Sequence, residues 1–216
     1  MTRRGLLSLA LSPVSYEVET IESPRQATAT FLRVARPRGK SNRTVLILPV
    51  TANISGQWGD GFYEAIKLNW VKRYNITIAA PSFSHLPWYA DHPTNLKIAQ
   101  ESYILQDILP RFSGRILLLG FSKSGNGALT LMLRNPGKFA AAAAWARPTL
   151  LEKHFRDPMK IAISGHGSFQ SELAGAHEKM IALGIQHEYD NATKRPRHWF
   201  SGWMEPAMAT LDRLTR

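Results

Sequence analysis

The sequence has no cysteine, few acidic residues and no long apolar run. Without cysteine among its 216 residues, the chain cannot form disulfide bonds, thiolate metal sites or a cysteine nucleophile. No segment approaches the ~20 apolar residues of a membrane-spanning helix. The histidines and carboxylates show no metal-ligand spacing, so we expect neither a metal nor another cofactor.

Acidic residues are scarce relative to basic ones. Sixteen Asp and Glu stand against 27 Lys and Arg, which gives a net charge of +11 and a sequence pI near 10.2. Such a charge favours acidic partners. However, the basic residues are spread along the chain, with one dense cluster at residues 194–197, and no nucleic-acid-binding motif is present. We therefore do not expect nucleic acid as the partner.

The first 14 residues differ from the rest of the chain. Arg3 and Arg4 followed by residues 5–11 weakly resemble a twin-arginine export signal. The apolar part is short, and no Ala-x-Ala cleavage site precedes Pro13. We interpret residues 1–14 as a lead-in and residues 15–216 as one domain of a cytoplasmic protein, with export as the alternative.

Short apolar segments alternate with helical patterns from residue 44 onward. Continuous apolar runs of this kind are typical of strands buried on both faces of a parallel sheet. The pattern predicts an α/β fold, with a mostly parallel twisted sheet and helices on both faces. We expect strands at 16–20, 27–34, 44–48, 76–80, 116–119, 139–145, 159–164 and 186–190, and helices at 62–72, 100–110, 126–133, 172–183 and 204–214. Residues 147–158 leave room for one short helix at 149–155, hence a minimal cap and an open site.

The stretch 117–129 has the strand–turn–helix layout of a nucleophile elbow. Small residues, Gly120 and Ser124, flank Ser122, as a tight and strained turn requires. The turn would expose the Ser122 hydroxyl and place the Lys123 N–H at a helix N-terminus, where it can stabilise an oxyanion. The loop after 44–48 would supply a second donor, for which Thr51 is our candidate.

The loop after 76–80 is rich in aromatic residues. Loops at the carboxyl ends of parallel strands line the ligand crevice, so Trp88 and Tyr89 are candidates for its wall. The alternative is that these rings merely bury apolar area in the loop.

A serine nucleophile needs a base, which an acid usually orients. His198 lies in the loop after the last predicted strand, where α/β-hydrolases place the histidine. The acid is not evident. Glu172 at the start of a helix is our candidate, with Asp190 as the alternative, and a dyad without an acid is also possible. A plain helix N-terminal charge explains Glu172 equally well.

Several of these stretches resemble the putative-esterase family of α/β-hydrolases, which includes esterase D, feruloyl esterases and mycolyltransferases. The similar stretches are 87–91, 101–110, 120–128, 136–139 and 198–203. The resemblance implies the α/β-hydrolase fold, with Ser122 as nucleophile and His198 as base. Two features depart from the family pattern: its acid position falls near Ser168, which is not acidic, and the segment between Trp145 and Met159 is short.

Taken together, the sequence predicts a serine hydrolase that cleaves a small-molecule carboxylic ester through a Ser-His-acid mechanism and an acyl-enzyme. A catalytically impaired binding protein on the same fold is the alternative. A protein that binds anionic polymers through its charge is a third, weaker reading.

Overall fold

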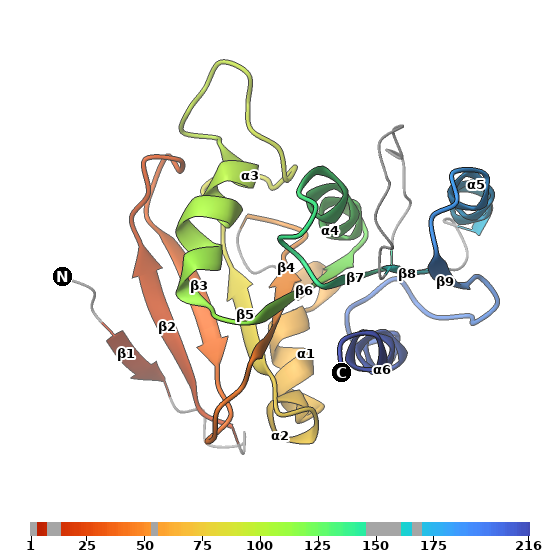
Figure 1. The fold of residues 1–216 in the computed structure, drawn as a ribbon. Coiled ribbons are helices and arrows are strands. Elements are labelled where there is room, and N and C mark those ends of the chain that lie inside the picture. The colour runs from red at the N-terminus through yellow and green to blue at the C-terminus, as the bar shows by residue number, and fades with distance from the viewer. Residues whose placement is uncertain (1–3, 8–13, 53–55, 146–160, 166–169) are drawn as a thin grey trace.

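The computed structural model describes residues 4–7, 14–52, 56–145, 161–165 and 170–216. A nine-stranded sheet runs through this part of the chain in the order β1-β2-β3-β5-β4-β6-β7-β8-β9 (Figure 1). The strands are β1 (Arg4–Leu7), β2 (Tyr16–Ile21), β3 (Thr30–Ala35), β4 (Arg43–Leu48), β5 (Thr77–Pro81), β6 (Arg115–Phe121), β7 (Ala141–Trp145), β8 (Ile161–Ser164) and β9 (His187–Asp190). In this order, each neighbouring pair from β1 to β5 is antiparallel. Each neighbouring pair from β5 through β4 to β9 is parallel.

Helices cover both faces of the sheet. They are α1 (Gly61–Lys67), α2 (Trp70–Arg73), α3 (Gln100–Tyr103), α4 (Lys123–Arg134), α5 (Gln170–Ala182) and α6 (Met204–Leu214). A 3-10 turn, η1 (Gly56–Trp58), precedes α1, while a π-helical turn, η2 (Ile104–Ile108), and a 3-10 turn, η3 (Leu109–Arg111), continue α3. Figure 1 shows α3, α4 and α5 on one side of the sheet and α1, α2 and α6 on the other.

Alternate residues of each central strand enter two separate cores. Leu46, Leu48 and Leu118 pack with α3, α4 and α5, while Ile47 and Leu119 pack with α1, α2 and α6. Successive strand residues point to opposite faces, so a strand covered on both faces must be apolar at every position. This explains the continuous apolar runs of the sequence and confirms the predicted α/β architecture.

Most of the predicted elements are present, with shifted bounds. The strands predicted at 16–20 and 27–34 are present as the antiparallel neighbours β2 and β3, and the last helix has the predicted bounds. Residues 4–7, which we expected in a lead-in, add β1 to the edge of the sheet. The predicted helix at 62–72 divides into α1 and α2 because Asn69 adopts a left-handed conformation, with φ of 57°. The short helix expected at 149–155 lies outside the described residues.

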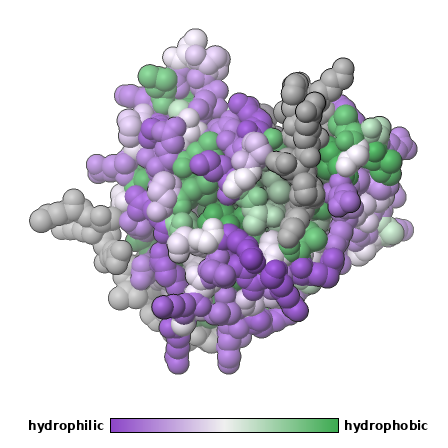
Figure 2. Space-filling model, in the orientation of Figure 1, coloured by the Kyte–Doolittle hydropathy of each residue, from purple (hydrophilic) through white to green (hydrophobic). Residues whose placement is uncertain are grey.

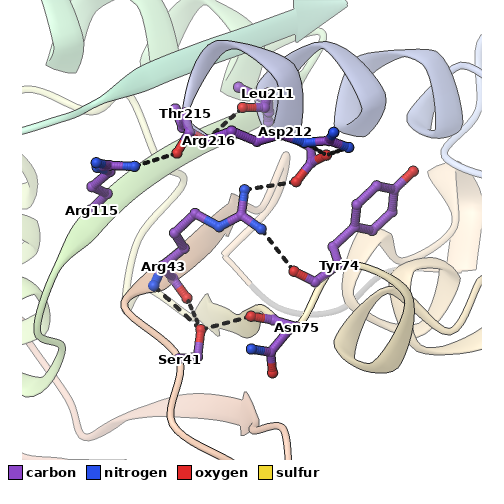
Figure 3. Close-up of polar contacts among 9 residues, drawn as sticks. All are labelled: Ser41, Arg43, Tyr74, Asn75, Arg115, Leu211, Asp212, Thr215 and Arg216. Atoms are coloured by element: carbon purple, nitrogen blue, oxygen red, sulfur yellow. Dashed lines mark hydrogen bonds and ion pairs between the residues drawn. The ribbon is translucent and has the colours of Figure 1, made fainter.

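A polar cluster joins α6 to the amino ends of the central strands (Figure 3). Arg43, the first residue of β4, donates to Asp212 at 2.7 Å and to the Tyr74 carbonyl at 2.8 Å. Arg216 also pairs with Asp212, at 2.6 Å, and Arg115 donates to the Thr215 carbonyl. Burial alone would raise the pKa of Asp212, but the hydrogen bonds from the two arginines outweigh it and lower that pKa. The C-terminal helix is thus fixed to the sheet end away from Ser122.

The surface is mostly hydrophilic on the face shown in Figure 2, where hydrophobic residues gather in the middle and over α5. On α5, Ile181 is exposed. Among the described residues no helix is long and apolar enough to span a membrane.

Candidate active site

The predicted strand–turn–helix stands at the carboxyl end of β6. Ser122 lies between β6 and α4 with φ of 53° and ψ of −121°. A residue other than glycine at positive φ is strained, at a cost of about 1–3 kcal/mol, and such strain clusters at functional sites. A Cβ atom on Gly120 would lie 2.1 Å from the Ser124 carbonyl oxygen, so this turn requires glycine there. The backbone is therefore built around the position of one serine side chain, although that side chain is buried and not exposed as the sequence predicted.

Ser124 closes the turn where many elbows have glycine. Its side chain is fully buried. The hydroxyl donates to the Phe121 carbonyl and accepts from the Phe121 N–H, both at 2.9 Å. Serine is thus more than a tolerated small residue here, because its hydroxyl satisfies two buried backbone groups that glycine would leave without this partner.

Arg197 is the side chain that contacts the hydroxyl of Ser122. Its Nη2 donates to Ser122 Oγ at 2.7 Å, and its guanidinium lies over the Trp58 ring, 5.1 Å from the centroid. Ser122 is only 8% exposed. We did not predict this contact, because residue 197 appeared in the sequence only as part of a basic cluster.

His198 points to the neighbouring turn. A Cβ atom on Gly59 would lie 2.5 Å from His198 Cε1. The ring nitrogen Nδ1 accepts the N–H of Phe200 at 3.1 Å. A neutral imidazole in this arrangement carries its proton on Nε2, which is the opposite of the tautomer that accepts a serine proton through Nε2. Among the described residues, the hydrogen bonds of the His198 side chain do not include one to Ser122.

Aromatic packing holds the loop of Arg197 and His198 behind the elbow. Phe121 lies 5.2 Å from Trp145, 5.5 Å from Trp199 and 6.2 Å from Trp203, measured between ring centroids. The Trp199 N–H donates to the Trp58 carbonyl at 3.0 Å. The two tryptophans of the predicted histidine segment therefore fix where residues 197 and 198 lie. In the sequence, the only sign of this packing is that Trp199 and Trp203 follow His198 closely.

The two carboxylates considered for the acid lie in different surroundings. Glu172 is in the first turn of α5 and accepts from the Ser171 hydroxyl at 3.1 Å. Asp190, at the end of β9, accepts from the N–H groups of Ala192 and Thr193, both at 3.1 Å. Burial would raise the pKa of Asp190, but its hydrogen bonds to Thr193 and Ala192 outweigh burial and lower that pKa. In the described chain neither carboxylate makes a hydrogen bond to His198.

The two aromatic residues proposed for the pocket wall, Tyr89 and Trp88, differ in burial. Tyr89 is fully buried, with φ of 59°, and its hydroxyl donates to the Pro49 carbonyl. Its ring fills the space beside Gly127, where a Cβ atom would lie 2.1 Å away. Burial raises the pKa of Tyr89 well above its ordinary value. Tyr89 thus supports the loop after β4 from beneath, whereas Trp88 is 67% exposed, with Lys123 Nζ 4.6 Å from its ring centroid.

Gln100, which belongs to no motif in the sequence, is buried and holds this aromatic loop. Its Oε1 accepts the N–H of Trp88 at 2.6 Å and that of Tyr89 at 3.1 Å, and its Nε2 donates to the Leu86 carbonyl at 3.1 Å. A single side chain therefore satisfies three backbone groups of the loop.

The two proposed oxyanion donors are at the same edge of the sheet. Thr51 follows β4 and lines a cavity of about 30 Å³ with Trp58 and Gly59. Lys123 opens α4, whose first N–H groups have no intrahelical acceptor. Strands β4 and β6 are parallel neighbours, with Leu48 opposite Gly120, so their following loops meet. Within the described ranges, no group of three or more His, Asp or Glu side chains could hold a metal ion.

The same fold occurs in solved esterase structures. An S-formylglutathione hydrolase from Agrobacterium tumefaciens superposes with a TM-score of 0.77 at 13% identity, over 98% of this chain and 99% of that one. A ferulic acid esterase gives a TM-score of 0.70 at 15% identity, with 95% and 98% covered. A ferulic acid esterase from Anaeromyces mucronatus gives 0.67 at 14%, with 97% and 93% covered.

These similarities define the class of fold. The sheet order, the elbow and the superpositions show an α/β-hydrolase fold, as predicted. The matched structures include the kinds of esterase that the sequence resembles. No family model matches the sequence, and no curated protein matches it significantly.

Proposed function

We propose that the protein is a serine hydrolase that cleaves a small-molecule carboxylic ester. The observation that carries this proposal is the strained backbone of Ser122 at the end of β6. Strain of this kind persists only where surrounding structure enforces it, and here Gly120 and the buried hydroxyl of Ser124 do so. The superposed ferulic acid esterases and S-formylglutathione hydrolase are consistent with the same chemistry.

The reaction would proceed in two steps. Ser122 Oγ attacks the ester carbonyl, its proton passes to His198, and the alcohol leaves with that proton as the C–O bond breaks. Water, deprotonated by His198, then attacks the acyl-enzyme, the bond to Ser122 Oγ breaks, and the proton returns from His198 to Ser122 as the acid leaves. The N–H groups of Lys123 and Thr51 would stabilise the oxyanion in both steps.

This mechanism requires movement of two side chains. Arg197 occupies the hydroxyl of Ser122, and His198 faces Gly59, so the guanidinium must yield and the imidazole must turn before proton transfer. The acid that would orient His198 in its new position is Glu172 or Asp190, or no acid is involved. A missing acid lowers the rate by orders of magnitude without preventing binding.

The contact between Arg197 and Ser122 also favours a second candidate function. In the described part of the chain the Ser122 hydroxyl accepts a hydrogen bond from a guanidinium and makes none to a histidine, an arrangement that suits a binding site as well as a nucleophile. On this reading the protein is a binding protein that retains the elbow without turnover.

Covalent labelling separates the two candidates. Incubation with a fluorophosphonate should add one probe mass to the peptide that contains Ser122, and Ser122→Ala should abolish both the label and the hydrolysis of p-nitrophenyl acetate. We expect a rate loss of at least about 10³-fold. Ser113→Ala, which changes an exposed serine just before β6 at the amino end of the sheet, is the matched control and should label normally. If the folded wild-type protein neither labels nor hydrolyses esters, the hydrolase function is excluded and the binding function remains.

A further inference from the structure

Two cationic side chains reach the elbow from different elements. Lys123 follows Ser122 directly and opens α4, while Arg197 comes from the loop after β9. Both lie against aromatic rings, Trp88 and Trp58 respectively. These contacts restrict the two side chains, and an ordered cation loses less entropy when it binds a ligand.

Arg197 lies where the reacting end of a ligand must be. Its Nη2 is 2.7 Å from Ser122 Oγ, the atom that would meet the ester carbonyl. A guanidinium presents its N–H donors in a planar fork that matches the two oxygens of a carboxylate. A ligand carboxylate close to the ester carbonyl would therefore come within reach of Arg197.

Lys123, the residue after Ser122, adds a second positive charge to the elbow, over the Trp88 ring. Partial burial lowers the pKa of its ammonium group, because the charged form loses hydration. In the described part of the chain no carboxylate lies within ion-pair distance of this ammonium group. A nearby anion would restore the favourable charge interaction. The N-terminus of α4, with no acidic residue in its first turn, adds a partial positive charge of the helix dipole.

We propose that the ester bound by this site carries a carboxylate, which Arg197 binds and Lys123 attracts. When the carboxylate replaces Ser122 Oγ as an acceptor for Arg197 Nη2, the hydroxyl is released for attack on the carbonyl. Arg197 would then select the substrate and keep the nucleophile occupied until a suitable substrate arrives. The kinetic part of this inference rests on the proposed ester hydrolysis, whereas the binding part does not.

The kinetic test compares anionic esters with capped, neutral counterparts. Monomethyl succinate against dimethyl succinate places the charge near the ester carbonyl on the acyl side, and acetoxyacetate against its methyl ester places it near the carbonyl on the alcohol side. In at least one pair, kcat/KM should be about tenfold or more higher for the anionic ester, the size expected for a hydrogen bond between charged groups. Arg197→Gln should reduce this preference to less than about threefold, and Arg197→Lys should retain part of it.

The matched control removes a cation elsewhere. Arg36 is exposed beyond β3 and pairs with Glu17 at 3.4 Å. Arg36→Gln changes the net charge as Arg197→Gln does, so it should leave both the activity and the preference unchanged. An equal loss of preference in the two variants would mean that overall charge, and not Arg197, attracts the anion.

Binding to a variant without the nucleophile tests the site independently of turnover. Calorimetry on Ser122→Ala should show that one anionic ester binds about tenfold or more tightly than its capped form. The difference should be lost in Ser122→Ala/Arg197→Gln, with folding checked by circular dichroism. Turnover without any anionic preference would overturn this inference and leave ester hydrolysis intact. Anion-selective binding without turnover by the wild type would support the carboxylate site and overturn ester hydrolysis. Equal binding of anionic and capped esters would overturn the inference in either case.

Discussion

Two arginines at opposite ends of the parallel sheet have different kinds of partner. At the amino end, Arg43 donates to the Asp212 carboxylate and to the Tyr74 carbonyl (Figure 3). At the carboxyl end, the hydrogen bond of Arg197 within the described chain that concerns the site goes to the Ser122 hydroxyl. A buried carboxylate is a strong, permanent partner for a guanidinium, whereas a hydroxyl is a weaker one that another acceptor can replace.

This contrast separates the parts of the molecule that hold the fold from those that serve the site. Helix α6 connects the two ends. It begins after Trp203, which packs on Phe121 next to the elbow, and it ends at Asp212 and Thr215 in the amino-end cluster. We infer that the amino-end cluster fixes α6 and so helps to position the loop that carries Arg197.

Replacing the two arginines should change the stability of the fold by different amounts. Arg43→Ala leaves the buried carboxylate of Asp212 with Arg216 alone, a residue whose side chain is 78% exposed. Breaking a buried ion pair costs about 3 kcal/mol at the low end of the usual range. We expect that loss in the free energy of unfolding, measured by urea denaturation. Arg197→Gln should change the same quantity by less than about 1 kcal/mol.

If Arg197→Gln destabilised the protein as much as Arg43→Ala does, that result would contradict the difference between the two arginines. Arg197 would then be a structural residue, and its contact with Ser122 a by-product of packing. Arg216→Ala is the control for the amino end. Because its side chain is mostly exposed, its loss should cost no more than about 1 kcal/mol.

A methyl group at Gly120 should destabilise the protein less than Arg43→Ala does, but it should distort the elbow directly. Its Cβ would meet backbone atoms of Ser124 and Gly125, which cannot move like the end of a flexible side chain. Such overpacking costs typically 1–3 kcal/mol, so we expect Gly120→Ala to lower the free energy of unfolding by about 2 kcal/mol. It should also reduce fluorophosphonate labelling of Ser122, because the turn must shift.

Gly175 provides the matched control for this substitution. It lies in α5 with open space around its Cβ position. Gly175→Ala should therefore stabilise the protein by about 0.4–1 kcal/mol and leave labelling unchanged. If Gly120→Ala behaved like Gly175→Ala, the elbow would not be strained as described.

The sequence predicts the elements better than the direction of side chains. The apolar runs at 44–48 and 116–119 were sufficient for the central strands, because only strands buried on both faces require them. The spacing of Gly120, Ser122 and Ser124 likewise predicted the turn that the structure shows. In both cases one local pattern specifies the backbone.

Side chains from loops are set by contacts that no local pattern contains. Arg197 reaches Ser122 because tryptophans 199 and 203 pack on Phe121. The alternatives for Tyr89, pocket wall or buried packing, depended on whether its hydroxyl found the Pro49 carbonyl. The left-handed Asn69, which divides the predicted helix, is likewise a single backbone choice inside a regular apolar pattern.

Acid should weaken the amino-end cluster more than the loop after β9. The pKa of Asp212 is lowered in the folded protein, despite burial, by hydrogen bonds from Arg43 and Arg216. The unfolded chain, with a pKa near 3.9, therefore binds a proton more readily. The stabilisation is fully present above that value and is lost as the pH falls towards the folded pKa. Asp190 has the same direction of shift, from burial opposed by hydrogen bonds to Thr193 and Ala192.

Asparagine variants measure the two contributions. The difference in the free energy of unfolding between wild type and Asp212→Asn should be constant from pH 7 to 5 and shrink between pH 4 and 3. Asp190→Asn should show the same trend with a smaller difference, because backbone N–H groups stabilise a carboxylate less than two guanidinium groups do. A difference for Asp212→Asn that stays constant down to pH 3 would contradict the assigned shift. A larger difference for Asp190→Asn would mean that the loop after β9 is fixed as firmly as the amino-end cluster.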